Sequence, residues 1–332
     1  MGKRVMWKKF PRASVGVGLM LGTLMCLAVS LAAFGGRWFW WLDLLAHGRP
    51  QYLVGAGMLM TIFLVKRKWR WAVMAGLACG LNAIVVLPYG VEKGEVVRQM
   101  GGRSDEVFKV ATINLLQLGP PDRDYGKLRR DLEPWQPDVV ALQEVGAEWA
   151  VEIELWKDWF PYRSLGMPVT RYHGLGLVSR VPWRRVERVV LGPVLITMGL
   201  AAELEVSGRV VSVLTVHALH PTDTVKVEIL KSWHEAIVKW VKDKRSAGHA
   251  VIVMGDFNST PWSVFYRDLV RATGLREAGR GHPFSATWRV GWPQQMMIDH
   301  VLYSDDWGRA NWSVGEDFDS DHRPVLVEFW WR

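Results

Sequence analysis

The chain has 332 residues, of which 49% are hydrophobic, and it carries 41 Lys and Arg against 33 Asp and Glu. This length and composition fit two average domains and exclude a disordered or collagen-like chain. Both cysteines, Cys26 and Cys79, lie in apolar runs, so the rest of the chain can form neither a disulfide framework nor a cysteine-based metal site.

Charge is distributed unevenly along the chain. Residues 1–90 hold 11 Lys and Arg but a single acid, Asp43, which leaves 30 basic and 32 acidic residues in the remainder. The net charge of +8 therefore belongs to the N-terminal part. Because these basic residues flank apolar runs, they indicate membrane topology rather than nucleic-acid binding.

Three apolar runs predict transmembrane helices at about residues 15–34, 52–65 and 71–87. The first is uncharged for 20 residues, which gives about 30 Å of helix and matches the hydrocarbon core of a bilayer. The other two are marginal by length, and a re-entrant or interfacial hairpin is the alternative for each. A cleaved signal peptide is the alternative for the first run, but its apolar core is longer than usual and two more runs follow.

Basic clusters predict the orientation of these helices. Residues 3–12 and 66–70 hold most of the Lys and Arg of residues 1–90, and with three spans both clusters lie on the same side of the membrane. The positive-inside rule makes that side cytoplasmic, so the chain after residue 90 is predicted to be extracytoplasmic. If residues 52–65 do not cross the membrane, the chain after residue 90 is predicted to be cytoplasmic instead.

Residues 91–105 are Gly-rich and charged and are predicted to be a linker. Residues 106–332 then alternate short apolar runs with turns, which indicates one layered α/β domain. Helices are predicted at residues 125–135 and at 224–241, where Asp223 is the expected N-cap. The predicted strands cover residues 107–113, 138–142, 174–179, 200–206, 210–217, 250–254, 298–303 and 325–329.

Polar side chains stand at the ends of most of these strands, where ligand sites of α/β proteins are built. Taken singly, each is explained as well by a turn, a helix N-cap or a buried structural residue. Together, carboxylates, amides and imidazoles without thiols suit Mg²⁺ or Mn²⁺ and a phosphate. The residues in question are Asn114, Glu144, His217, Asp256, Asn258, Asp299, His300, Ser320, Asp321 and His322.

The same positions carry seven short motifs in a characteristic order: ATIN (111–114), LQE (142–144), VSR (178–180), TVH (215–217), GDFN (255–258), IDH (298–300) and SDHRPV (320–325). This set resembles the endonuclease/exonuclease/phosphatase superfamily, which includes DNase I-like nucleases, inositol polyphosphate 5-phosphatases and neutral sphingomyelinases. GDFN together with a C-terminal SDHRP is specific, whereas the other motifs are weak alone. The resemblance implies a four-layer α/β sandwich of two packed mixed sheets flanked by helices.

The resemblance also implies a metal site. Glu144 is expected to hold the ion with Asn114 beside it, and Asp321 is expected to complete the site. The expected ion is Mg²⁺, with Mn²⁺ or Ca²⁺ as alternatives. Some nucleases of the superfamily carry an acid two residues after this asparagine, but here that position is Leu116, which makes abasic-site DNA repair a poorer candidate.

The remaining motif residues are expected to act on the phosphate. The resemblance implies that Asp256 and Asn258 orient the attacking water and the phosphate, while His217 binds the phosphate and stabilises the transition state. His322, oriented by Asp299, is expected to be the general base or a phosphate-binding imidazolium. These roles agree with the needs of phosphate-ester hydrolysis, namely an activated water and a cation on the non-bridging oxygens.

The sequence thus predicts a membrane-anchored, metal-dependent phosphoesterase that hydrolyses a phosphodiester. Its partners would be the bilayer and a phosphate-ester substrate, either a nucleic acid or a phospholipid head group, and no protein partner is predicted. The arrangement resembles bacterial members anchored in the inner or plasma membrane. The alternatives are a phosphomonoesterase of inositol-phosphate type and a tethered, non-catalytic binding module. A transporter is disfavoured because the spans lack a central ionisable residue.

Overall fold

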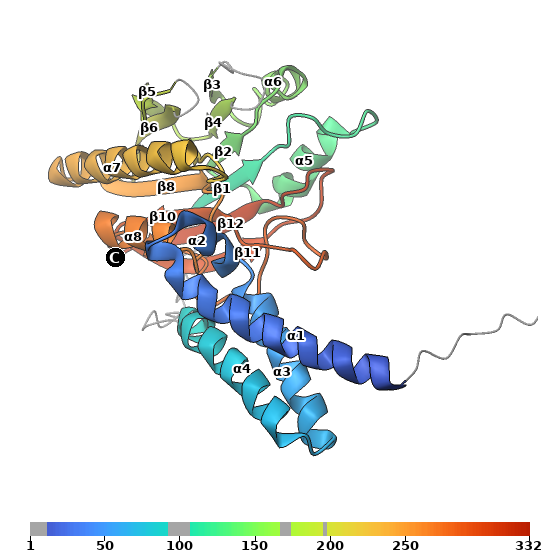
Figure 1. Cartoon of the computed structure of the whole chain (residues 1–332). Coiled ribbons are helices and arrows are strands. Elements are labelled where there is room, and N and C mark those ends of the chain that lie inside the picture. The colour runs from blue at the N-terminus through green and yellow to red at the C-terminus, as the bar shows by residue number, and fades with distance from the viewer. Residues whose placement is uncertain (1–11, 92–106, 167–173, 195–197) are drawn as a thin grey trace, which may run out of the picture. The chain divides into compact units, whose positions relative to one another are not determined.

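The computed structural model describes residues 12–91, 107–166, 174–194 and 198–332 (Figure 1). The chain forms two compact units, Met1–Pro88 and Tyr89–Arg332. The predicted linker at residues 91–105 lies almost entirely outside the described residues.

The first unit is helical. Its elements are α1 (Arg12–Ala32), a 3₁₀ segment (Ala33–Arg37), α2 (Trp40–Ala46), α3 (Arg49–Val65) and α4 (Trp69–Gly90). Two helices of the described residues, Val15–Arg37 with its 3₁₀ extension and Trp69–Gly90, are long and apolar enough to cross a membrane. Helix α3 has 17 residues, so at 1.5 Å per residue it is about 25 Å long and falls short of a full hydrocarbon core.

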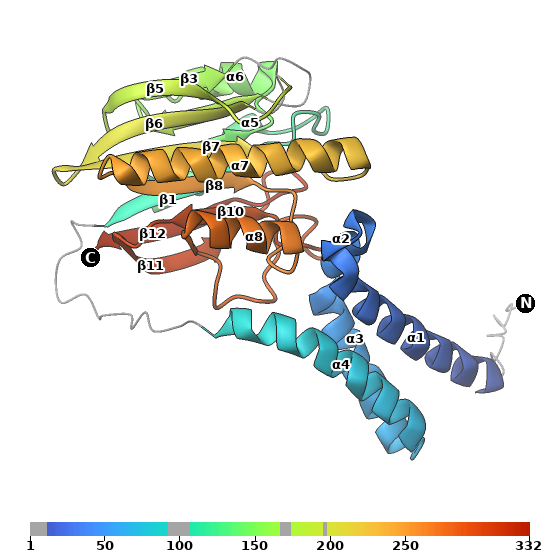
Figure 2. The same ribbon diagram turned by 60° about the vertical axis from the view of Figure 1, so that its left-hand side comes forward.

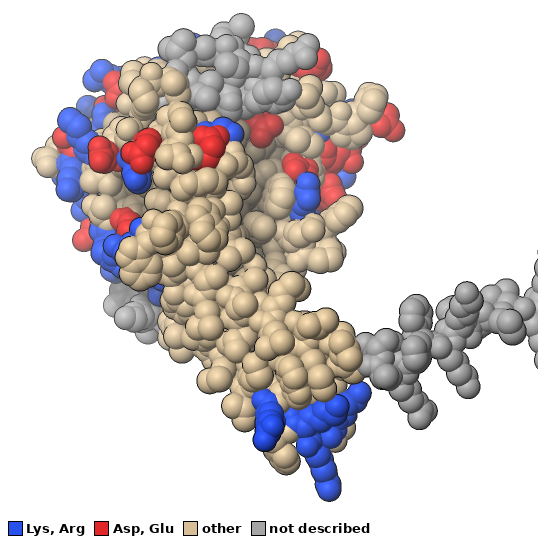
Figure 3. Space-filling model, viewed as in Figure 1, with Lys and Arg blue, Asp and Glu red and all other residues tan. Residues whose placement is uncertain are grey.

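Polar contacts connect the three long helices. Asn82 of α4 donates from Nδ2 to Ser30 Oγ of α1 at 2.7 Å, and its Oδ1 accepts from Arg49 Nη1 of α3 at 3.3 Å. All three side chains are buried. In Figure 3 the basic side chains of this unit gather at the turn between α3 and α4, and the helix surface next to them carries no charge.

The second unit contains two six-stranded mixed sheets. The first has the order β11-β12-β1-β2-β4-β3 and the second β5-β6-β7-β8-β10-β9. The strands of the first sheet are β1 (Phe108–Asn114), β2 (Val139–Gln143), β3 (Tyr162–Gly166), β4 (Leu175–Ser179), β11 (Trp307–Val314) and β12 (Val325–Trp331). Those of the second are β5 (Trp183–Val190), β6 (Met198–Val206), β7 (Arg209–His217), β8 (Ala250–Asp256), β9 (Arg276–Glu277) and β10 (Asp299–Tyr303).

Helices cover the outer face of each sheet, which completes the predicted four-layer sandwich (Figure 2). Helices α5 (Tyr125–Leu132) and α6 (Ala147–Glu154) pack on the first sheet, and α7 (Thr224–Ser246) and α8 (Val264–Thr273) on the second. As predicted, Asp223 caps α7, because its carboxylate accepts from Lys226 N at 2.9 Å.

Strand alternation divides each sheet between two cores. In β1, Ala111 and Ile113 belong to the core shared with α5 and α6, and in β7, Leu214 and Val216 belong to the core shared with α7 and α8. The residues between them therefore face the opposite sheet. At the end of β1 that inward position is held by Asn114.

A polar seam crosses from one sheet to the other below this end. Thr112 Oγ1 donates to Gln143 Oε1 at 3.2 Å, and Gln143 Nε2 donates to Thr215 Oγ1 at 2.9 Å. All three side chains are fully buried. Since a buried polar group is costly without a partner, this chain of bonds fixes how the strands β1, β2 and β7 face each other.

All eight predicted strands are present, with ends within two residues of the prediction. The four strands that the sequence did not predict, β3, β5, β9 and β11, are the four edge strands of the two sheets. The predicted helix at residues 125–135 ends as a 3₁₀ turn, Glu133–Trp135, and α2, α6 and α8 were not predicted.

Candidate active site

Four inward-facing polar residues meet at one end of the sandwich. Asn114, His217 and Asp256 are the last residues of β1, β7 and β8. Asp299 is the first residue of β10, and because β10 runs antiparallel to β8 it pairs with Asp256 in register. Parallel pairing of β7 with β8 likewise sets His217 beside Asp256.

Asp256 is at the centre of the group. Its Oδ2 accepts from Asn114 Nδ2 at 3.0 Å and lies 3.6 Å from His217 Nε2. Its Oδ1 accepts from the backbone N–H of Asn258 at 2.7 Å. The preceding Gly255 has a φ of 151°, and a Cβ there would lie 1.9 Å from the Val216 carbonyl oxygen, so only glycine permits this approach of the two strands.

Glu144 extends the group across the sheets. It follows β2 with a φ of 55°, and its Oε1 accepts from Asn114 Nδ2 at 3.0 Å and lies 3.9 Å from His217 Nε2. Asn258 also has a left-handed φ, 47°, and its Nδ2 donates to the carbonyl of Ala218 at 2.8 Å. Left-handed backbone at a non-glycine residue is costly and is concentrated at functional sites.

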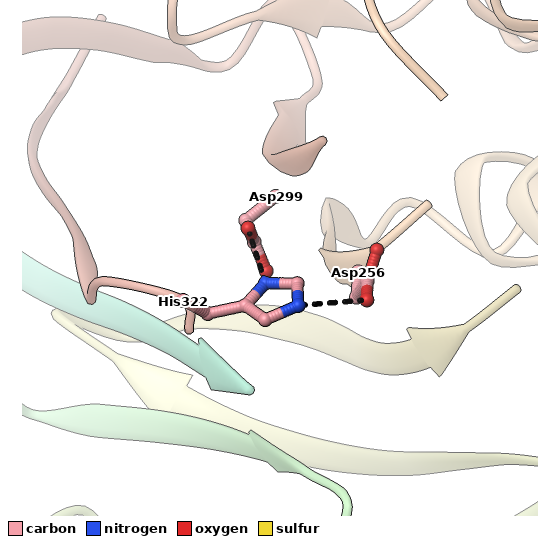
Figure 4. Close-up of side chains that lie close together, drawn as sticks. All are labelled: Asp256, Asp299 and His322. Carbon is pink, nitrogen blue, oxygen red and sulfur yellow. Dashed lines mark hydrogen bonds and ion pairs between the residues drawn. The ribbon is translucent and has the colours of Figure 1, made fainter. Parts of the chain in front are cut away.

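His322 completes the group from the segment before β12. Its Nδ1 lies 2.9 Å from Asp299 Oδ2, and its Nε2 lies 3.8 Å from Asp256 Oδ2, as Figure 4 shows. Asp299 is itself fixed by Thr287, whose Oγ1 donates to Asp299 Oδ2 at 2.5 Å and accepts from the Asp299 backbone N–H at 3.1 Å. The carboxylate thus directs the imidazole so that Nε2 faces the centre of the site.

The carboxylates and imidazoles shift one another's pKa values. Burial, and then the nearby Asp299 carboxylate, raise the pKa of Asp256 to about 7. Burial alone would lower the pKa of His322, but the Asp299, Asp256 and Asp321 carboxylates together raise it to about 10. Burial lowers the pKa of His217 more than the Glu144 carboxylate raises it. At neutral pH the site therefore pairs a charged His322 with a neutral His217.

Asp321 lies at the rim of the site. Its Oδ2 accepts from Trp288 Nε1 at 2.8 Å, and its Oδ1 is 4.0 Å from His322 Nε2. The neighbouring Ser320 donates from Oγ to the carbonyl of Asn114 at 2.9 Å and accepts from the His322 backbone N–H at 3.1 Å. These bonds attach the SDH segment to the end of β1.

The donor set fits a hard divalent cation. Glu144 and Asp256 flank the Asn114 amide, so two carboxylates and an amide, the ligand types of a hard cation, lie together. Asp321 Oδ1 is buried and has no hydrogen-bond donor among the described residues. Ligand atoms of Asp256, Asp299 and His322 also lie within 4.8 Å of one another, and within this group Asp299 Oδ2 and His322 Nδ1 are in contact at 2.9 Å.

Of the ten polar strand-end residues, the structure brings eight together, places Ser320 beside them through its bonds to Asn114 and His322, and separates one. Asn114, Glu144, His217, Asp256, Asn258, Asp299, Asp321 and His322 all lie in this group. His300 points away from it, since its Nε2 contacts the carbonyl of Ser259 at 2.8 Å and its Nδ1 lies 3.4 Å from Glu277. Thr287 and Trp288, which contact Asp299 and Asp321, were missed because no strand pattern marks them.

Comparisons with known proteins agree with this geometry. A sequence model described as the Endonuclease/Exonuclease/phosphatase family matches residues 111–322, while no curated protein matches the chain. The human Nocturnin catalytic domain with bound sulfate anion is 19% identical with a TM-score of 0.55, over 68% of this chain and 95% of that one.

Two further structures are similar over 68% of this chain. An endonuclease/exonuclease/phosphatase from Beutenbergia cavernae is 20% identical, with a TM-score of 0.58 and 72% of its own chain covered. D. rerio TDP2 complexed with single strand DNA product is 15% identical, with a TM-score of 0.57 and 99% of its chain covered. At these identities the comparisons establish the shared fold.

Proposed function

Because the chain belongs to the endonuclease/exonuclease/phosphatase family, we propose that it is a membrane-anchored, divalent-metal-dependent phosphoesterase that hydrolyses a phosphodiester. The observation that carries this proposal is the convergence of side chains from both sheets on Asp256, which contacts Asn114 and lies within 4 Å of His217 and His322. A structural role alone does not require two imidazoles and several carboxylates at one buried point.

Glu144, Asn114 and Asp321 would hold the metal ion. When bound, the ion supplies Lewis-acid stabilisation of the charge on the phosphate oxygens. Asn114 Oδ1 accepts from the Leu116 backbone N–H at 3.0 Å, so a rotation of the amide that turned this oxygen to the ion would exchange that hydrogen bond for a metal contact.

Asp256 and the two histidines would act on the water and the phosphate. With a pKa of about 7, Asp256 can accept a proton from the attacking water near neutral pH. His322, whose pKa is about 10, stays protonated, so its Nε2–H would bind a phosphate oxygen rather than act as the base. The neutral His217 would donate a hydrogen bond to the phosphate from Nε2. Asp299 and Thr287 hold His322 in place.

A diester is proposed because one structure with this fold holds a DNA product, whose backbone is a phosphodiester. D. rerio TDP2 is described with a single strand DNA product and Nocturnin with a sulfate anion, and both share the fold of this domain. The near balance of basic and acidic residues after residue 90 gives no general attraction for nucleic acid. A nucleic acid and a phospholipid head group are therefore both substrates to test, with a phosphomonoester as the alternative.

The helical unit would be the membrane anchor, and residues 106–332 the catalytic domain. Helices α1 and α4 have the length and composition of spans. Arg49 of α3 binds Asn82 of α4, which in turn binds Ser30 of α1. A short α3 that is packed between two spans can cross a locally thinned bilayer. Three spans with cytoplasmic basic clusters would place the catalytic domain outside the cytoplasm.

Activity is tested with the full-length chain purified in detergent. Bis-p-nitrophenyl phosphate, p-nitrophenyl phosphate, plasmid DNA, RNA and sphingomyelin vesicles are each incubated with Mg²⁺, Mn²⁺ or EDTA. We expect metal-dependent turnover that is lost in Asp256→Asn and kept in Asp243→Asn, a matched change at an exposed residue of α7. Absence of turnover from folded protein on every substrate would favour the binding module.

The orientation is tested in intact cells after Cys26 and Cys79 have been replaced by alanine. Single cysteines are placed at the exposed Glu235 of α7 and at Lys68 in the turn between α3 and α4. A membrane-impermeant maleimide should label Glu235→Cys and leave Lys68→Cys unlabelled until the cells are opened. The reverse pattern would place the catalytic domain in the cytoplasm.

A further inference from the structure

A cavity of about 320 Å³ opens beside the active site. Its lining includes Asp321 and Ser320 from the SDH segment, together with Arg289, Trp292 and Arg323. Asp321 is common to both places, since its Oδ1 lies 4.0 Å from His322 Nε2. A group bound in the cavity would therefore be next to a phosphate held by His322.

Backbone hydrogen bonds join the loop that lines the cavity to the segment that carries His322. Trp288 exchanges two backbone bonds with Met296, of 2.9 and 3.1 Å, which closes a short loop between them. Arg289 N donates to the Asp321 carbonyl at 2.7 Å, and Arg323 N donates to the Thr287 carbonyl at 2.7 Å. The loop that carries Arg289 and Trp292 is thus fixed to the chain segment that carries His322.

Two guanidinium groups of the cavity have donors to spare. Among the described residues, neither Arg289 nor Arg323 forms an ion pair with a carboxylate, whereas other arginines of the domain do, as in Arg163 with Glu154. Arg289 stacks over the Trp288 ring, with its Cζ 4.4 Å from the ring centroid. Stacking holds a guanidinium in place without using its N–H groups.

Arg289 also adopts strained backbone, with a φ of 47°. A non-glycine residue rarely takes this conformation unless its surroundings enforce it, and such strain is found at binding and catalytic sites. Beside it, Trp292 is 64% exposed. An exposed indole next to two guanidinium groups offers a flat apolar surface for a planar or apolar part of a ligand.

The acidic residues of the cavity limit what it can bind. Asp321 Oδ2 accepts from Trp288 Nε1, and Asp317 Oδ1 accepts from the Asp319 backbone N–H. These carboxylates would repel a mobile anion, so the cavity should bind free phosphate weakly. A phosphate that is part of a larger substrate would bind more tightly than free phosphate, because the scissile phosphate of the same substrate is already bound in the adjacent active site.

We propose that Arg289 and Arg323 bind a second phosphate of the substrate, adjacent to the scissile phosphodiester, with Trp292 covering the group that links the two. This assignment rests on the proposed function and makes the enzyme selective for substrates with two neighbouring phosphates. Bidentate contact from guanidinium suits a phosphate in particular. The next phosphate of a nucleic acid and a phosphorylated lipid head group share this chemistry.

The test uses substrates that differ by one phosphate. Thymidine 5′-(p-nitrophenyl phosphate) is compared with its 3′-phosphorylated form, using the full-length chain in detergent with Mg²⁺ or Mn²⁺. We expect KM to be lower by about tenfold for the 3′-phosphorylated form, the effect of one good ionic contact. Arg289→Met and Arg323→Met should each remove most of this ratio. Arg184→Met, at an exposed residue of β5, is the matched control.

A lipid arm distinguishes the source of the phosphate. Vesicles containing phosphatidylinositol 4-phosphate are compared with vesicles of phosphatidylinositol, which lacks the second phosphate. A preference for the phosphorylated lipid that depends on both arginines would support the proposal with a lipid substrate, and a preference only in the thymidine pair would support it with a nucleic acid. Equal KM values within both pairs, from an active enzyme, would overturn it.

A binding measurement separates this proposal from the proposed function. Inorganic pyrophosphate is titrated into the chain by calorimetry in metal-free buffer, where no turnover is needed. We expect weak binding that the Arg289→Met/Arg323→Met double variant loses and that Arg289→Lys partly keeps. Pyrophosphate binding without hydrolysis of any substrate would contradict the proposed function alone. If the wild type hydrolyses its substrates and the double variant matches it in both the kinetic and the binding assay, the cavity assignment alone is contradicted.

Discussion

Asp256 and Asp299 face each other in register across strands β8 and β10, and each is 1% exposed. Two carboxylates at facing positions repel one another, and burial increases the cost. The His322 ring lies against both, with Nδ1 2.9 Å from Asp299 and Nε2 3.8 Å from Asp256. The imidazolium is therefore the counter-charge that allows the pair to exist.

Replacing His322 should affect activity and stability together. His322→Gln removes the counter-charge and the group that faces the phosphate, so we expect kcat on bis-p-nitrophenyl phosphate to fall by about 10²- to 10⁴-fold. The metal-free variant should also unfold at a lower temperature at pH 8. Adding Asp256→Asn should recover part of the melting temperature and none of the activity. Additive losses in the double variant would contradict the counter-charge role.

Thr287 is predicted to be a positioning residue. Thr287→Val removes the hydroxyl that holds Asp299 Oδ2 and accepts the Ile298 and Asp299 N–H groups, so Asp299 would no longer orient His322. We expect kcat to fall by about tenfold or more with little change in KM. Thr287→Ser keeps the hydroxyl and should restore kcat. If Val and Ser variants behave alike in kcat and in the pH profile, the hydroxyl has no such role.

The stability of the metal-free protein should fall as the pH rises. The pKa of Asp256 rises from 3.8 to about 7 on folding, so the stability from its protonated form is complete below pH 4 and is lost as the pH approaches 7. For His322 the rise is from 6.5 to about 10, and its contribution is lost between those values. Each pKa unit corresponds to about 1.4 kcal/mol, so each of the two groups accounts for a change of roughly 4–5 kcal/mol at most.

This pH dependence is measured as the melting temperature in EDTA from pH 4 to 10. Asp256→Asn should flatten the part between pH 4 and 7, with Asp243→Asn as the control, and addition of Mg²⁺ or Mn²⁺ at pH 8 should raise the melting temperature of the wild type. A wild-type curve parallel to that of Asp256→Asn over pH 4 to 7 would show that Asp256 does not titrate as described.

The polar seam between the sheets should contribute to stability. Gln143→Met leaves the buried hydroxyls of Thr112 and Thr215 without their bonds to Gln143, which we expect to cost about 1–3 kcal/mol in the free energy of unfolding. The triple variant with Thr112→Val and Thr215→Val leaves no unpaired hydroxyl and should be more stable than Gln143→Met alone. Denaturant unfolding of the three proteins checks the order, and a triple variant less stable than the single one would contradict it.

The sequence allowed the central strands and most of the site to be predicted, because burial on both faces gives continuous apolar runs that end in polar residues. The edge strands were missed because they lack such runs: β5, WRRVERVV, has one neighbouring strand, and its side chains are exposed or half-buried. No residue pattern states that Asp299 pairs with Asp256 or that Thr287 holds it, since these are contacts between distant segments. His300 was misplaced because strand alternation directs its side chain to the opposite face from Asp299.

The two sheets divide the site between them: Asn114 and Glu144 come from the side of β1 and β2, and His217, Asp256 and Asp299 from β7, β8 and β10. Neither sheet alone holds both the proposed ion ligands and Asp256, the proposed base. Catalysis is therefore a property of the docked pair, and its onset during refolding should follow the joining of the sheets rather than the formation of either one. A half-assembled folding intermediate, in which the two sheets have not yet joined, would therefore be unable to cleave phosphate esters.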